Sequence, residues 1–140
     1  MIIGIDPGSA SGGIAILSEG KVEVFKMPET EMDIFQIFED RCFDKPTVFL
    51  EIVHSMPKQG ISSAFKFGKN FGFLLGVVTA LRYPLHMVSP QRWQKELGCM
   101  SRGDKNVTKV KCQQLFPQIK VTHAVADALL IAEYGRRSLK

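Results

Sequence analysis

Three acidic residues occupy positions where charged side chains are uncommon. Asp6 ends an apolar run, Glu51 interrupts another, and Asp127 lies in the most apolar part of the C-terminal helical pattern. Carboxylates are rarely buried unless they are paired or bind a metal. Each has a simpler explanation when taken alone: Asp6 could cap a turn, Glu51 could face solvent from an edge strand, and Asp127 could pair with Arg136 or Arg137. Three such positions in one short chain favour a shared chemical role.

Carboxylates contributed by separate elements suit the hydrolysis of phosphodiesters. That reaction needs an activated water and neutralisation of charge on the attacking and leaving oxygens, which two magnesium ions about 3.5–4 Å apart can provide. Magnesium prefers hard oxygen ligands and keeps several of its waters, so a few carboxylates suffice. The sequence therefore predicts a site for two Mg²⁺ ions, in which Mn²⁺ is expected to substitute.

The pattern of apolar and turn residues predicts the elements that hold these side chains. Strands are expected over residues 1–5, 13–17, 21–25, 47–53 and 85–88, with 21–25 alternating as an edge strand does. Helices are expected after caps at Thr30, Ser89, Asp104 and Thr122, and over residues 62–82. A hairpin ribbon followed by crossovers predicts an α/β fold, with a mixed sheet covered by helices on both faces.

Composition limits the class of protein. The 140 residues are 45% hydrophobic and 23% charged, so we expect one globular domain over residues 1–140. Cys42, Cys99 and Cys112 are too widely spaced for a zinc motif, and their odd number favours reduced thiols. The longest apolar run, residues 73–81, is too short to span a membrane. We expect a cytoplasmic protein of a bacterial or phage-infected cell, without a signal peptide, transmembrane segment or membrane partner.

Charge is unevenly distributed. Residues 91–111 hold six basic and two acidic side chains, whereas residues 19–44 hold three basic and eight acidic ones. This asymmetry favours one face that binds a polyanion, although a solvated basic loop and helix would give the same pattern. The expected phosphate contacts are Lys58, Lys66, Lys69, Arg92, Arg102, Lys105, Lys109 and Lys111.

The motifs around the three acidic residues resemble a known family. Taken in order, they are similar to those of the RuvC-like Holliday-junction resolvases, and most similar to compact phage-type members. The likeness spans nearly the whole chain and rests on these segments: IGIDPG at residues 3–8, GGIA at 12–15, LEIV at 50–53, Ser89-Pro90 with Trp93, GDK at 103–105, LFP at 115–117 and ADALLIA at 126–132.

The resemblance implies a ribonuclease H-like fold with a five-stranded mixed sheet, and a homodimer that makes paired nicks in four-way junctions. It also implies that Asp6 bridges two metal ions, with Glu51 on one and Asp127 on the other. The family has a fourth acidic or histidine ligand three residues before the last aspartate, where this sequence has Ala124. We expect His123, four residues before Asp127 on the same helical face, to replace it.

Two further positions follow from the resemblance. Relatives can carry an aromatic wedge after the catalytic glutamate's strand, and here His54 or Met56 would probe the opened bases, although an ordinary loop is an equal alternative. Lys105 lies where relatives often place a basic residue close to the cleaved strand. We expect weak sequence preference at the cut and no dedicated protein partner.

Glycines at residues 68, 72 and 76 form a stripe along the longest helical pattern. Each costs a helix about 1 kcal/mol relative to alanine, so the stripe predicts a close contact. Either the sheet or the same helix of a second subunit could supply it.

Three other functions remain open from the sequence. A compact enzyme could cut flaps, forks and junctions alike. The segment GIDPG at residues 4–8 also resembles the phosphate loop of actin-like sugar kinases and ATPases, although these need two such domains. A DNA-binding module with a decayed catalytic site is the third possibility.

Overall fold

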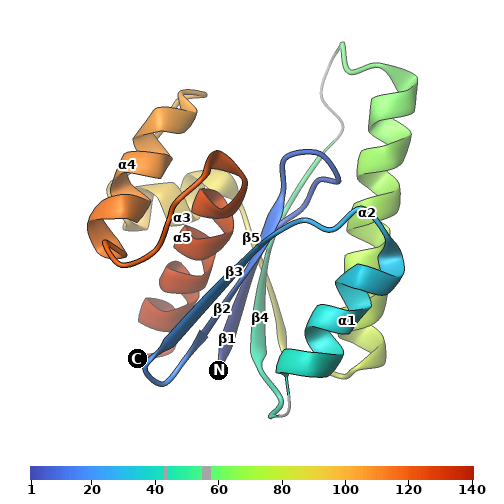
Figure 1. Ribbon diagram of the computed structural model, residues 1–140. Helices are drawn as coiled ribbons and strands as arrows, with labels where there is room; N and C mark the ends of the chain where they lie inside the picture. Colours follow the sequence, from blue (N-terminus) through green and yellow to red (C-terminus); the bar gives the residue numbers. More distant parts are fainter. Residues whose placement is uncertain (43, 55–57) are drawn as a thin grey trace.

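The computed structural model describes residues 1–42, 44–54 and 58–140. Over these residues, the strands and helices follow one another in the order that the sequence predicts (Figure 1). The strands are β1 (Ile2–Asp6), β2 (Gly13–Ser18), β3 (Lys21–Lys26), β4 (Thr47–Glu51) and β5 (Leu85–Val88). The helices are α1 (Glu31–Arg41), α2 (Ile61–Ala80), α3 (Pro90–Glu96), α4 (Lys105–Leu115) and α5 (His123–Ser138).

The strands form one mixed sheet in the order β3-β2-β1-β4-β5. β1, β2 and β3 are antiparallel neighbours, whereas β4 and β5 run parallel to β1. The α/β class and the edge position of β3 are therefore confirmed. β4 lies between β1 and β5, so the alternative that Glu51 faces solvent from an edge strand is wrong.

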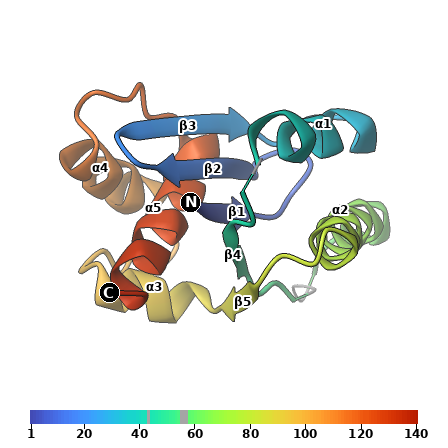
Figure 2. The same ribbon diagram turned by 90° about the horizontal axis from the view of Figure 1, so that it is seen from below.

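Helices cover both faces of the sheet, as predicted. α1 and α2 lie on one face, while α5 lies on the other with α3 and α4 beside it (Figures 1 and 2). Alternation along β1 explains the two layers, because Ile3 and Ile5 pack in the core under α1 and α2. Ile2 and Gly4 point the other way, toward α5.

α5 packs against the sheet at unusually short range because two facing positions are glycines. A Cβ at Gly4 would collide with the backbone of Ala128 and Ala132, and one at Gly13 would collide with the backbone of Ala124. Only glycine allows this approach. The N-terminal half of α5 is thereby held directly over β1 and β2.

Most predicted helix boundaries are confirmed. The Thr30 and Asp104 side chains cap α1 and α4 by accepting from the backbone N–H groups of residues 33 and 106. Pro90 is the first residue of α3, and Gly98 follows its end with φ of 65°. Ser89 and Thr122 precede α3 and α5 in extended conformation, but neither makes a side-chain cap hydrogen bond, so the cap predicted at Ser89 is not formed by its side chain.

The glycine stripe of α2 faces away from the sheet. A Cβ at Gly68, Gly72 or Gly76 would meet no described atom within 4 Å. The interpretation that the sheet packs closely against these glycines is therefore wrong. Ile61 and Phe65 continue the same helical face and are 91% and 72% exposed, so the face is apolar and open.

The cysteines agree with the sequence interpretation. Cys42, Cys99 and Cys112 are free thiols buried in the core. None of the helices in the described part of the chain is long and apolar enough to cross a membrane.

Candidate active site

The site begins where β1 and β4 end side by side. These parallel strands pair Ile5 with Leu50, so the next residues along them, Asp6 and Glu51, are neighbours. Side chains alternate along a strand, and residue 49 points toward α5 from β4 as Gly4 does from β1. Asp6 and Glu51 therefore face the side of the sheet that α5 covers.

Asp127 reaches the same place from α5. It lies on the helix between Ala124, which packs over Gly13, and Ala128, which packs over Gly4. Gly13 is in turn the β2 partner of Asp6. Asp6 and Asp127 thus lie on the same side of the molecule, held together by the glycine contacts.

Electrostatics confirm that the three carboxyl groups are close. Burial raises the pKa of Asp6 well above its ordinary value, and the charges of Glu51 and Asp127 raise it further. Burial, opposed by a hydrogen bond and assisted by the charge of Asp127, raises the pKa of Glu51 to about 7. The site therefore does not readily carry three negative charges at neutral pH unless a cation balances them.

Asp127 keeps one unused oxygen. Its Oδ1 is buried and has no hydrogen-bond partner among the residues that the structure describes. Burial raises its pKa, while a hydrogen bond from Thr108 and the charges of Lys105 and His123 lower it. A buried carboxylate oxygen without a donor costs free energy unless a cation or water occupies that position. The effect of His123 on this pKa shows that His123, at the exposed start of α5, lies near Asp127.

The alternative partners of Asp127 are engaged elsewhere. Arg136 and Arg137 both bind Glu133, with Nε–O distances of 2.7 and 2.8 Å. An ion pair of Asp127 with either arginine is therefore excluded.

Lys105 is the basic residue whose charge acts on two of the three carboxyl groups. Its charge lowers the pKa of both Asp6 and Asp127. Lys105 is exposed at the first position of α4, so its ammonium can stabilise the ionised carboxylates and still contact solvent or a ligand. The family resemblance predicted that Lys105 lies close to the cleaved strand.

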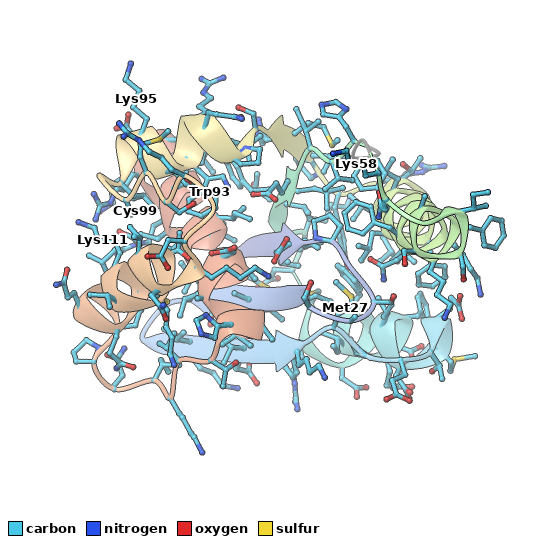
Figure 3. The ribbon with its side chains drawn as sticks, turned by 90° about the horizontal axis from the view of Figure 1, so that it is seen from above. Met27, Lys58, Trp93, Lys95, Cys99 and Lys111 are labelled. Atoms are coloured by element: carbon cyan, nitrogen blue, oxygen red, sulfur yellow. The ribbon has the colours of Figure 1, made fainter. Side chains whose placement is uncertain are left out.

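Trp93 and Thr108 belong to the site, although neither was predicted to take part in its chemistry. The Trp93 Nε1–H donates to Glu51 Oε2 at 2.6 Å, and Trp93 is fully buried between α3 and the strand ends (Figure 3). Thr108 is buried on α4, where its hydroxyl lies 3.3 Å from the carbonyl oxygen of Lys105 and also lowers the pKa of Asp127. The available signals were the place of Trp93 beside Ser89-Pro90 in the family resemblance and the presence of a threonine in an otherwise basic segment.

Asn70 fixes the loop that follows Asp6. Its Oδ1 accepts a 2.9 Å hydrogen bond from the N–H of Gly8, across the sheet edge from α2. Gly8 has φ of 137°, and its carbonyl accepts from the N–H of Gly12 at 2.9 Å. The turn predicted at Asp6-Pro7-Gly8 is confirmed, and Asn70 holds it in place.

The side chains do not form a closed metal cage. Among residues 1–42, 44–54 and 58–140, no three His, Cys, Asp or Glu side chains are gathered closely enough to hold a metal ion by themselves. Carboxylates repel one another without a cation, and Glu51 is held by Trp93. Magnesium needs few direct ligands because it retains waters. The unpartnered Asp127 oxygen and the all-oxygen carboxylate set fit such a partly hydrated ion.

A cleft of about 680 Å³ opens beside Glu51. It lies between the end of β4 and the starts of α2 and α3, and Phe67 and the exposed His54 are among its lining residues. Its volume is in the range of cofactor and substrate sites. His54 is thus next to Glu51, as expected, whereas Met56 lies outside the described residues.

The other predicted phosphate contacts come from several elements, and only some of them lie near the strand ends. Lys58 lies at the start of α2, and Lys111 lies on the α4 side, so the two flank the strand ends (Figure 3). Lys69 binds Glu31 at 2.8 Å but remains 63% exposed. Arg92 lines a separate pocket at the C-terminal end of α5. The remaining predicted contacts are Lys66 on α2, Arg102 before α4 and Lys109 on α4.

Comparison with solved structures finds RuvC of Thermus thermophilus. A structure described as T. thermophilus RuvC in complex with Holliday junction substrate is 19% identical, with a TM-score of 0.67 over 98% of this chain and 94% of that chain. A second T. thermophilus RuvC structure is also 19% identical, with a TM-score of 0.65, covering 98% and 95%. No family model and no curated protein matches the sequence. The predicted RuvC-like, ribonuclease H-like fold is confirmed.

Proposed function

We propose that this protein is a divalent-metal-dependent endonuclease that makes paired nicks in four-way DNA junctions. The observation that carries the proposal is the convergence of Asp6, Glu51 and Asp127 at one end of the sheet, beside Lys105. The likeness to a RuvC bound to a Holliday junction supports branched DNA as the substrate class. The basic side chains around the strand ends would contact its phosphates.

Asp6, Glu51, Asp127 and His123 are the residues that would hold Mg²⁺ or Mn²⁺. Two such ions supply an activated water and neutralise charge on the phosphate that is cut. The hard carboxylate oxygens suit magnesium, and the unpartnered Oδ1 of Asp127 provides a free position for a ligand bond.

The other side chains of the site act on the carboxylates and the DNA. Lys105 favours the ionised forms of Asp6 and Asp127, and its exposed ammonium would bind a phosphate of the strand that is cut. Thr108 would orient Asp127 when its hydroxyl donates to the carboxylate rather than to the carbonyl of Lys105. The cleft beside Glu51 would receive the DNA backbone, with His54 at its rim.

A cleavage assay tests the proposal. Labelled four-way junction, flap and linear duplex are incubated with the protein and Mg²⁺, with chelator as control. We expect paired nicks in the junction with Mg²⁺ alone, and loss of cleavage but not of junction binding in Asp127→Asn. Junction binding without cutting would instead indicate a DNA-binding module. Equal cutting of flap and junction would broaden the substrate class to branched DNA in general.

His123 is proposed as the fourth ligand because it lies one helical turn before Asp127 at the start of α5, close enough to affect that carboxylate. We expect His123→Ala to raise the Mg²⁺ concentration needed for half-maximal cleavage. Unchanged metal dependence in this variant would remove His123 from the ligand set while leaving the carboxylates in place.

His54 is proposed to stack at the junction centre. It is exposed and lines the cleft beside Glu51, where an opened base could meet it. His54→Ala should weaken affinity for the junction more than affinity for linear duplex. Equal losses for both DNA forms would contradict this role.

A homodimer is proposed from the open face of α2. Ile61 and Phe65 are strongly exposed there, and Gly68, Gly72 and Gly76 would let a second helix approach closely. Phe65→Glu should produce a monomer in sedimentation experiments and convert paired nicks into single ones. A native protein that sediments as a monomer at micromolar concentration would contradict this interface.

A further inference from the structure

The side chain of Glu51 is held by a hydrogen bond from the indole of Trp93. The Trp93 Nε1–H donates to its Oε2 at 2.6 Å, a short hydrogen bond. No other hydrogen bond to the Glu51 side chain is present among the described residues. One carboxylate oxygen is therefore fixed by the protein, and the other has no hydrogen-bond partner among residues 1–42, 44–54 and 58–140.

Trp93 is itself rigid. Its side chain is fully buried in the core cluster that includes Leu97, Cys99 and Cys112, so the ring has no room to turn. α3 is anchored in addition at its far end, where Gln94 accepts from the backbone and side chain of Ser101 at 3.0 and 3.2 Å. The donor position is thus set by the fold rather than by solvent.

An indole N–H suits this position for a chemical reason. It donates only and does not titrate, so it cannot replace the carboxylate oxygen as a ligand or compete for its proton. Groups that donate to metal-binding carboxylates orient them and increase metal affinity. A buried indole N–H needs a hydrogen-bond acceptor, and any carbonyl oxygen could fill that need. In this protein the acceptor is a carboxylate of the candidate site.

We propose that Trp93 is a positioning residue, which holds one oxygen of Glu51 through its indole N–H and leaves the other oriented for a divalent cation. This inference rests on the proposed function, because it assigns Glu51 to the metal site. The effect of Trp93 is indirect, since it reaches the cation and the DNA only through Glu51.

The test exploits the fact that the chain has a single tryptophan. Residue-specific incorporation can replace Trp93 with 3-benzothienylalanine, in which sulfur takes the place of the N–H in a ring of nearly the same shape. 5-Fluorotryptophan, which keeps the N–H, is the matched control. Circular dichroism establishes that each protein is folded, and electron paramagnetic resonance of free Mn²⁺ gives the metal dissociation constant without any DNA present.

We expect the sulfur analogue to bind Mn²⁺ about 10-fold more weakly or worse, and the fluorinated control to bind it as the native protein does. The Mg²⁺ concentration for half-maximal junction cleavage should rise in parallel. Equal Mn²⁺ affinity in the sulfur analogue and the control would overturn the positioning role alone. Failure of the native protein to bind Mn²⁺ would overturn the proposed metal-dependent function itself, so the two failures are distinguishable.

Discussion

Replacing Glu51 with glutamine should stabilise the metal-free protein at alkaline pH. The pKa of Glu51 is raised from 4.5 to about 7, so the folded state binds its proton more tightly than the unfolded chain does. Stability therefore falls as pH rises through this interval and stays reduced above pH 7. The difference corresponds to about 3 kcal/mol for the ionised group. Glutamine removes this cost and can still accept from Trp93.

The assay is thermal or urea unfolding in chelator, followed by circular dichroism at two pH values. At pH 8, Glu51→Gln should gain about 3 kcal/mol in free energy of unfolding, which corresponds to roughly 10 °C in Tm for a chain of this size. At pH 4.5 native Glu51 is protonated in the folded state, so the gain should fall below about 0.5 kcal/mol. Adding Mg²⁺ should stabilise the native protein more than it stabilises Glu51→Gln.

A second buried acid provides the matched control. Glu133 is 2% exposed, and hydrogen bonds from Arg136 and Arg137 lower its pKa against the opposing effect of burial. Glu133→Gln should therefore lose stability at pH 8, opposite in sign to Glu51→Gln. A Glu51→Gln variant that is no more stable than the native protein at pH 8, or that gains the same stability at both pH values, would contradict the cost assigned to the ionised Glu51.

Three further outcomes follow from the same structure. Lys105→Ala should lower the cleavage rate at pH 7 by about 10-fold or more and shift the pH–rate profile to higher pH, because the charge of Lys105 lowers the pKa of Asp6 and Asp127. As a control, Lys109→Ala should mainly weaken DNA binding. Gly4→Ala should destabilise the protein by about 1–3 kcal/mol in urea unfolding, since its Cβ collides with the backbone of α5, whereas Gly68→Ala in the monomeric Phe65→Glu background should be neutral or stabilising. Junction affinity measured by anisotropy should fall steeply with added salt, and a flat response would argue against phosphate contacts.

The elements of the fold could be predicted from the sequence because apolar periodicity and cap residues are local signals. Thr30 and Asp104 cap their helices as expected, and alternation along residues 21–25 identified the edge strand. The carboxylates could be predicted for a related reason, since a charged residue in an apolar segment demands a partner. Asp6 and Glu51 then meet because parallel strands end together.

What the sequence could not provide depends on tertiary contacts. The stripe at Gly68, Gly72 and Gly76 suggested a close approach, but helical spacing does not show which face meets the sheet. The glycines that do permit such an approach, Gly4 and Gly13, lie in strands opposite α5. The bonds of Trp93 to Glu51 and of Asn70 to the β1–β2 loop join elements distant in sequence, so no local pattern announces them.

The most direct test of the shared metal centre is to let a bound ion cut the polypeptide beside its own ligands. Fe²⁺ replaces Mg²⁺, ascorbate and peroxide generate radicals at the bound iron, and mass spectrometry locates the breaks in the chain. We predict cuts near Asp6, Glu51 and Asp127 together, all suppressed by excess Mg²⁺. Cuts confined to one of these segments, or cuts that Mg²⁺ does not suppress, would contradict a common site.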